Sequence, residues 1–287
     1  TLDRSSAASD VYKRQTMKNA DLSTPQIMGI LNTTPDSFLD QGKYNSLEKA
    51  AKRATEIYEE GASLIDIGGE STRPGSNSIT PQEELERVRP ILQYLYSKNY
   101  PLPISIDTRN AITAQVALDL GARLINDISG GIDPSMRKLV TQYGVEICIM
   151  HMRGEPKTMQ TDPDYPDGII PHLIKWFEAR IELLLQDGID LSQIILDPGI
   201  GFGKTAGHNM EIYRSLAQIK SHFGLRIMIG GSHKSFMRSI CKKQNLLPAT
   251  LVMHTIAAMQ KIDILRVHNV CEHLDLAKLT GSYLSNA

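Results

Sequence analysis

The stretch Ile194-Ile195-Leu196-Asp197-Pro198-Gly199-Ile200-Gly201-Phe202-Gly203-Lys204 decides the fold class of this chain. Three apolar residues lead into a carboxylate and then into a glycine-rich loop. This is the pattern of a parallel strand that is buried on both faces and ends at a ligand. The stretch therefore predicts a buried strand that places Asp197 at a binding site.

The same pattern, an apolar run closed by a polar residue and a turn, recurs along the chain. The other runs are Ile27–Asn32, Ser63–Glu70, Ile104–Asp107, Leu124–Asp127, Glu146–His151, Arg226–Ser232 and Ile264–His268. With the run that ends at Asp197 there are eight predicted strands. Their spacing leaves room for a loop and a helix between consecutive strands.

Helical patterns fill the intervals between the predicted strands. One helix is expected from Ser46, as N-cap, to Gly61, and another opens with a capping box and a proline at Thr80-Pro81-Gln82-Glu83. Further helices are predicted at Asn110–Leu120, at Asp133–Tyr143, at about Pro171 to Gln186, as a single helix that carries Ile212, Leu216 and Ile219, and as a short C-terminal helix.

Eight strand-helix units without a linker between them predict one α/β domain. A closed parallel (β/α)8 TIM barrel is favoured over an open doubly wound sheet, because no G-x-G-x-x-G fingerprint follows the first strand. In such a barrel the active site lies at the carboxyl ends of the strands. Residues 1–16 have no periodicity and precede the first methionine, so they are expected to be an extension foreign to the domain at residues 17–287.

Composition narrows the partners and the compartment. The chain has 287 residues, 41% of them hydrophobic and 22% charged, and a formal net charge of −1, which gives no reason to expect nucleic acid or an anionic membrane as partner. Cys148, Cys241 and Cys271 form no C-x-x-C pair, so neither a disulfide framework nor a zinc knuckle is indicated. No apolar run approaches the ~18 residues of a membrane span. A cytoplasmic protein that acts on small molecules is expected.

The polar residues at the strand ends are expected to face one pocket. They are Asn32, Thr72 with Arg73, Asp107, Asn126, Asp197, Lys234, Arg266 and His268. Each alone has an ordinary explanation, as a helix cap, a turn residue, a surface cation or a core histidine. Their recurrence at the same level of successive units favours a shared site.

The residue types in this set indicate a ligand chemistry. Asp107, Asn126, Asp197 and Lys234 could hydrogen-bond a flat heterocycle that has donors and acceptors on its edge, and a pterin is such a ring. Arg266 and His268 suit a diphosphate, and the Asn32 oxygen suits a magnesium ion that keeps several waters.

At these residues the sequence resembles the dihydropteroate synthase family, a family of pterin-binding TIM barrels. The resemblance runs from Ile27 to Leu284 and is carried by seven motifs. They are Asn32-Thr33-Thr34-Pro35-Asp36-Ser37-Phe38, Gly69-Glu70-Ser71-Thr72-Arg73-Pro74-Gly75, Ser105-Ile106-Asp107-Thr108, Asn126-Asp127, Met150-His151-Met152, the run from Asp197 to Lys204, and Arg266-Val267-His268. It implies a transferase, usually dimeric and a target of sulfonamides, that joins p-aminobenzoate to 6-hydroxymethyl-7,8-dihydropterin diphosphate in folate biosynthesis.

The resemblance also implies a role for each matching residue. Asp107, Asn126, Asp197 and Lys234 would hold the pterin, while Asn32, Arg266 and His268 would hold diphosphate and Mg²⁺. The loops after the first two strands would act as lids and, with later loops, place Phe38, Thr72, Arg73, Pro74, Phe202 and Ser232 around p-aminobenzoate, with Asp40 holding the closed lid, against Arg73. The catalytic set would be Asp197, Lys234, Arg266 and His268.

Three positions depart from the pattern of that family. His233 stands where the family usually has arginine, Asn269 where it has aspartate, and Gln41 where it has glycine. The departures leave open a paralogue with weak activity, another amine acceptor, or a silent binding module, and a pterin-binding methyltransferase domain shares the barrel. Because side chains alternate along a strand, Asn269 is expected to point away from the diphosphate and to cap the following helix.

Overall fold

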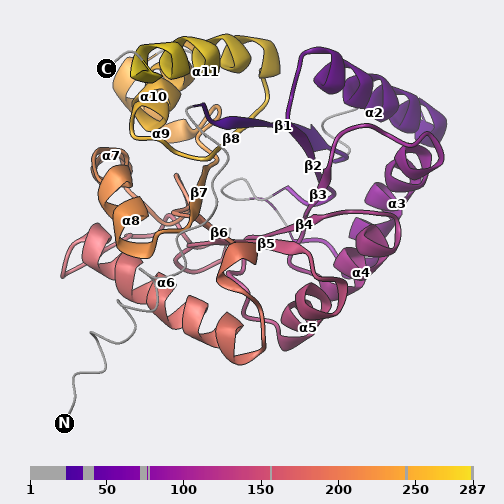
Figure 1. Cartoon of the computed structure of the whole chain (residues 1–287), viewed down its shortest axis with the longest axis horizontal. Coiled ribbons are helices and arrows are strands. Elements are labelled where there is room, and N and C mark those ends of the chain that lie inside the picture. Colours follow the sequence, from indigo (N-terminus) through magenta and orange to yellow (C-terminus); the bar gives the residue numbers. More distant parts are fainter. Residues whose placement is uncertain are drawn as a thin grey trace.

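Eight parallel strands close into a barrel at the centre of the computed structural model, which describes residues 24–34, 42–71, 76, 78–155, 157–242 and 245–285, with side chains from residue 47 onward in the second range (Figure 1). Each strand pairs with the next along the chain, and β8 pairs with β1. The strands are β1 (Gln26–Asn32), β2 (Leu64–Gly68), β3 (Ile104–Asp107), β4 (Leu124–Asp127), β5 (Glu146–Met150), β6 (Ile194–Asp197), β7 (Arg226–Ile229) and β8 (Ile264–Val267). The predicted (β/α)8 barrel is confirmed.

Helices surround the barrel and fill the interval after each strand (Figure 1). They are α2 (Gly42–Glu59), α3 (Pro81–Ser97), α4 (Ala111–Asp119), α5 (Pro134–Tyr143), α6 (Ile169–Gln186), the 3₁₀ turn η2 (Leu191–Gln193), α7 (Ala206–Arg214), α8 (Leu216–Phe223), α9 (Ser235–Cys241), α10 (Leu247–Met259) and α11 (Val270–Ser285). Among the described residues, no helix combines the length and apolar character of a membrane span.

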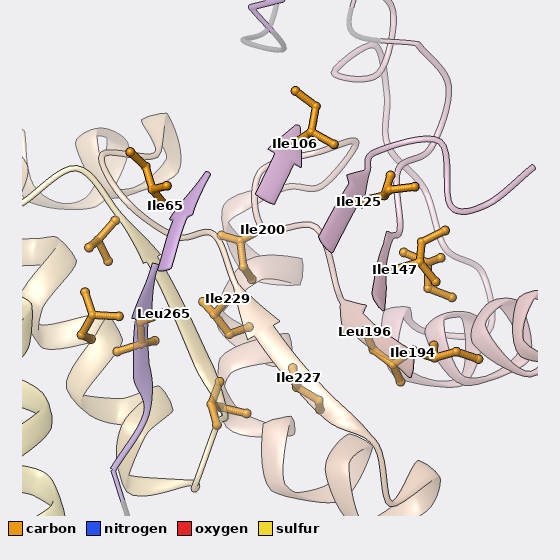
Figure 2. Close-up of a cluster of buried hydrophobic side chains, with 14 of the residues drawn as sticks. Ile65, Ile106, Ile125, Ile147, Ile194, Leu196, Ile200, Ile227, Ile229 and Leu265 are labelled. Carbon is orange, nitrogen blue, oxygen red and sulfur yellow. The ribbon is translucent and has the colours of Figure 1, made fainter. Parts of the chain in front are cut away.

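Alternation along the strands separates two apolar layers. One set of strand residues, including Ile65, Ile106 and Ile125, packs outward against the helices in the main core, and Figure 2 shows such residues on successive strands. The alternate positions form a second buried cluster inside the barrel, made of Met28, Leu64, Leu124, Cys148, Ile195, Met228 and Ile264. Because side chains alternate, the residues two positions further along these strands also face the interior, nearer its carboxyl end.

Three helix predictions were wrong in detail. α2 begins at Gly42, before Ser46, so Ser46 is not its N-cap. The single helix expected around Ile212 to Ile219 is two helices, because at Ser215 the chain leaves helical geometry and its N–H donates to two carbonyls of α7. Ile212, Leu216 and Ile219 are nevertheless all buried, which explains why their spacing predicted one helix. The C-terminal helix α11 has 16 residues and is not short.

The predicted capping box of α3 is confirmed. Thr80 Oγ1 accepts from the Glu83 N–H at 3.2 Å, and Glu83 Oε2 accepts from the Thr80 N–H at 2.8 Å. Pro81 occupies the first turn, where a missing N–H costs nothing. This cap fixes the start of the helix that supports β3.

A buried carboxylate on α3 joins this helix to the end of β3. Glu84 is fully buried, and its Oε2 accepts from Thr108 Oγ1 at 2.8 Å, from Asn110 Nδ2 at 2.9 Å and from Thr113 Oγ1 at 2.6 Å. The Glu84 side chain thereby anchors the loop that follows Asp107. This loop lies at the carboxyl end of the barrel, which we call the mouth.

Glu84→Ala is expected to lower the free energy of unfolding by more than about 2 kcal/mol, because three donors lose a charged acceptor in the interior. Urea denaturation measures the difference. Glu86→Ala, on the exposed face of the same helix, should change stability by no more than ~0.5 kcal/mol. Equal stability of the two variants would show that Glu84 does not anchor the loop.

Candidate active site

A charged network crosses the barrel interior at its carboxyl end. Arg266 on β8 donates from Nε to Asp66 Oδ2 on β2 at 2.5 Å and from Nη2 to Asp107 Oδ2 on β3 at 2.5 Å. Asn126 on β4 donates from Nδ2 to the same Asp66 oxygen at 3.1 Å. Since β8, β2 and β4 are not neighbours in the sheet, these bonds must run through the interior. Neither bond of Arg266 uses Nη1.

Burial and pairing set the protonation of this network. Burial raises the pKa of Asp107 to about 7, against the opposing effect of the Arg266 charge. Burial lowers the pKa of Arg266, but the two carboxylates more than offset this, so its pKa is raised overall and it stays charged. Asp66 is fully buried, and its Oδ1 has no hydrogen-bond partner among the described residues. The network therefore presents an open acceptor and a carboxyl that titrates near neutral pH.

Asp197 ends β6 beside this network. It is buried, and its Oδ1 accepts from the Gly199 N–H at 2.8 Å. Burial raises the pKa of Asp197, while the Gly199 N–H and the charges of Lys234 and Arg266 act against this. Gly199 has φ +69°, and an added Cβ would lie only 1.9 Å from the His151 carbonyl oxygen, so the loop can pass here only with glycine.

Lys234 follows the loop after β7, and its charge acts on Asp197. Its Nζ lies 4.0 Å from the centroid of the Phe202 ring, a cation-π distance. Phe202 is 8% exposed and packs with Ile128, Met150 and Met159. The predicted lysine and the predicted aromatic residue are thus brought together by two different loops.

The loop after β7 is tied to the end of β8 by two successive contacts. Ser232 Oγ lies 3.0 Å from His268 Nδ1, and His233 Nε2 lies 2.9 Å from Asn269 Oδ1. His233 and Asn269, two of the departures noted in the sequence, are therefore partners of each other. His233 holds this position in a left-handed backbone conformation, φ +55°.

At the rim, Arg109 joins three loops. Its Nη2 donates to Glu70 Oε1 and its Nη1 to Glu155 Oε2, both at 3.1 Å. Glu70 follows β2, Arg109 follows β3 and Glu155 follows β5, so this ion pair network fixes one side of the mouth. None of the three was predicted as a site residue.

The structure brings most of the predicted pterin and diphosphate residues to one mouth. Asn32, Asp107, Asn126, Asp197, Arg266 and His268 lie at the carboxyl ends of their strands, with Ser232 and Lys234 in the loop after β7 and Phe202 in the loop after β6. The predicted residues Phe38, Asp40, Thr72, Arg73 and Pro74 lie outside the described residues, as do Gln41 and residues 1–16.

Asp66 is the principal residue that the sequence reasoning missed. Only residues that close an apolar run were selected, and Asp66 stands inside the run Leu64-Ile65-Asp66-Ile67-Gly68. A carboxylate in the middle of a strand that is otherwise buried was the available signal, because a buried charge requires a partner.

Comparisons with known proteins agree on one family. The family model described as "Pterin binding enzyme" matches residues 28–268. The chain is 39% identical to the dihydropteroate synthase of Escherichia coli (strain K12), over 92% of this chain and 94% of that protein. It is 44% identical to the dihydropteroate synthase of Synechocystis sp., over 89% of each. The crystal structure of Yersinia pestis dihydropteroate synthase in a sulfonamide drug complex superposes with a TM-score of 0.86, at 39% identity, covering 93% of this chain and 96% of that one.

Asn269→Asp is expected to change kcat/KM by less than about tenfold, or ~1.4 kcal/mol, because Asn269 bonds His233 and not His268. His268→Ala should cost appreciably more. Steady-state kinetics of the two variants compare them. A gain of roughly a hundredfold in Asn269→Asp would instead mean that an aspartate here is needed to orient the site.

Proposed function

We propose that this chain, which belongs to the pterin-binding enzyme family and is a dihydropteroate synthase of folate biosynthesis, carries out its reaction on the charged network of the barrel mouth. The reaction joins p-aminobenzoate to 6-hydroxymethyl-7,8-dihydropterin diphosphate and gives 7,8-dihydropteroate and diphosphate. The observation that carries the assignment is that five strands bring together the buried residues Asp66, Asn126 and Asp197 and the partly buried pair Asp107 and Arg266.

The side chains at the barrel mouth match the hydrogen-bond donors and acceptors on the edge of a pterin ring. The carboxylates of Asp107 and Asp197 accept from the ring N–H and amino groups, Asn126 can donate and accept, and Lys234 donates to a ring oxygen or nitrogen. Asp66 accepts from both Arg266 and Asn126 and thereby positions their side chains. Its open Oδ1 can accept from the ring directly or through a water.

The diphosphate leaves between β8 and β1 in this proposal. Breaking the bond between the pterin methylene and oxygen moves an electron pair onto the diphosphate and leaves a cation that the pterin ring delocalises. Arg266 Nη1 and His268 stabilise the negative charge that develops. Nearby carboxylates tolerate the pterin cation. The lone pair of the p-aminobenzoate amine then forms the new C–N bond to the pterin methylene, and the nitrogen releases one proton to solvent.

Magnesium is proposed as the cofactor, held through the Asn32 side-chain oxygen. Among the described residues, no three His, Cys, Asp or Glu side chains are grouped so that they could hold a metal. A site of one protein oxygen, substrate phosphate oxygens and waters fits Mg²⁺, which binds in this way where phosphates are present. When bound, Mg²⁺ neutralises charge on the leaving diphosphate.

The amine acceptor is placed by the loops. Phe202 and Ser232 are proposed to contact p-aminobenzoate together with Phe38, Thr72, Arg73 and Pro74, and Asp40 is proposed to hold the lid. Inhibition by sulfonamides is proposed as well, since the Yersinia pestis structure is that of a sulfonamide complex. A cytoplasmic location is also proposed, which the free thiols of Cys148, Cys241 and Cys271 suit.

A homodimer is proposed through the outer face of α10 and α11, which pack side by side (Figure 1). Val252, Ile256 and Met259 are exposed at one-turn intervals on α10, and Leu279 and Tyr283 are exposed on α11. Apolar residues that share a face in this way are typical of an interface and not of scattered surface positions. A second copy of the chain would bury them.

The protein with Mg²⁺, the pterin diphosphate and labelled p-aminobenzoate is expected to form dihydropteroate. Lys234→Ala and Asp197→Ala should each lower kcat/KM about 5- to 150-fold, because an unpaired buried polar group costs ~1–3 kcal/mol. Excess chelator should stop turnover. Lys138→Ala, an exposed change on α5, serves as control. Absence of product, or full rate in chelator, contradicts the proposed reaction or its metal.

Val252→Glu with Leu279→Glu is expected to turn the dimer into a monomer, because two charges would be buried at the interface. Light scattering gives the mass, and circular dichroism checks that the fold is kept. Leu185→Glu places a negative charge at an exposed position of α6, away from the proposed interface, and should leave the dimer intact. A monomeric wild-type chain would exclude the proposed interface.

A further inference from the structure

A buried lysine and two histidines form a chain behind the pterin carboxylate, and the proposed reaction uses none of them. Lys204 ends the loop that begins at Asp197, and only 3% of it is exposed. Its Nζ lies 2.8 Å from His151 Nδ1. His151 Nε2 in turn lies 3.1 Å from His172 Nε2, and His172 is exposed on α6. The chain therefore runs from solvent to the inner side of the loop.

The atoms around Lys204 Nζ suit the protonated form of this side chain. An ammonium has three N–H donors, and three acceptors surround Nζ: His151 Nδ1, the His151 carbonyl at 3.3 Å and the Phe202 carbonyl at 3.0 Å. When all three are used, His151 Nδ1 accepts. The ring then carries its proton on Nε2 and donates it to His172 Nε2, which fixes the tautomers of both histidines.

This chain also touches Asp197. The His151 N–H donates to the Asp197 carbonyl at 2.9 Å, and the Lys204 charge favours the ionised form of the Asp197 carboxylate. The glycines between them fit closely, since a Cβ at Gly203 would lie 2.9 Å from the Arg153 carbonyl. Lys204 and Asp197 are thus held in fixed relation by the loop that joins them.

We propose that Lys204 is a positioning residue for the pterin site, which keeps Asp197 ionised without touching the substrate, and that His151 and His172 carry the proton that sets its charge. The proposal rests on the proposed function, because Asp197 matters only as a pterin acceptor. Nothing in it requires a cofactor or a further reactant.

The proton transfer is balanced along the chain. When Lys204 loses its proton to His151 Nδ1, His151 gives its Nε2 proton to His172 Nε2, and His172 gives its Nδ1 proton to solvent. The reverse sequence recharges Lys204. Each ring is neutral before and after, which agrees with burial holding the pKa of His151 far below its usual range.

Burial lowers the pKa of Lys204 to about 7, while the Asp197 charge opposes that shift, so the lysine is charged below neutral pH and loses its charge above it. Other titratable or charged groups face the chain from the packed elements. They are Asp197, Lys234, Arg153, Tyr165, Lys175 and His208.

Lys204→Met, which removes the charge and keeps the length, tests the electrostatic effect. Loss of the Lys204 charge raises the pKa of Asp197, so the acidic midpoint of pterin binding should move to higher pH. Calorimetry with a pterin that lacks the diphosphate measures it. The matched change Lys138→Met, exposed on α5, should leave the midpoint unchanged. An unaltered midpoint in Lys204→Met, with only a lower Tm, would reduce Lys204 to a structural role and overturn the proposal.

Histidine ¹⁵N NMR of the wild-type protein tests the chain without any turnover, and so independently of the proposed function. At pH 6, His151 should carry its proton on Nε2, and between pH 6 and 8 the proton should move to Nδ1 as Lys204 loses charge. In His172→Gln, which keeps a hydrogen-bond partner but cannot pass a proton, exchange at His151 should slow at least tenfold. A proton on His151 Nδ1 at pH 6, or unchanged exchange in His172→Gln, would exclude the chain.

Discussion

The shared guanidinium of Arg266 is the interaction on which the mouth of this barrel depends. Three charged side chains lie in an interior that would otherwise exclude them, and each is tolerable only because the others are there. Arg266 donates to both Asp66 and Asp107, and Asp66 in turn orients Asn126. The binding site is therefore part of the core, and its geometry is as fixed as the packing of the strands.

The strand pattern was readable from the sequence because parallel strands in a barrel are covered on both faces. Ile104–Asp107 and Leu124–Asp127 have the predicted bounds, since continuous apolar runs closed by an acid leave little ambiguity. The strand ends also predicted most of the polar residues at the mouth. Chain order is enough for this, because every parallel strand of a barrel presents its carboxyl end on the same side.

The partners of those residues could not be predicted in the same way. Arg266 and Asp66 are separated by most of the chain, and only closure of the barrel brings β8 opposite β2. Arg266 was expected at the diphosphate, and the structure shows that two of its nitrogens are already bound to carboxylates. His233 and Asn269 were noted as separate departures, although they are in contact. Lys204 ends the glycine-rich motif after β6, but its three acceptors come from backbone and ring atoms that no side-chain pattern reveals.

The balance of charge at the mouth has a consequence for ionic strength. Asp66, Asp107 and Asp197 stand against Arg266, Lys204 and Lys234. The two groups with a pKa of about 7, Asp107 and Lys204, have opposite charges, so the set has no net charge near neutral pH. A neutral pterin ring then meets local dipoles and short bonds, which dissolved salt screens little. The diphosphate is different, because it approaches as a polyanion through solvent and is attracted over distances comparable with the Debye length of ~8 Å in physiological salt. Added salt should thus weaken capture of the charged end of the substrate while leaving recognition of its ring almost unchanged.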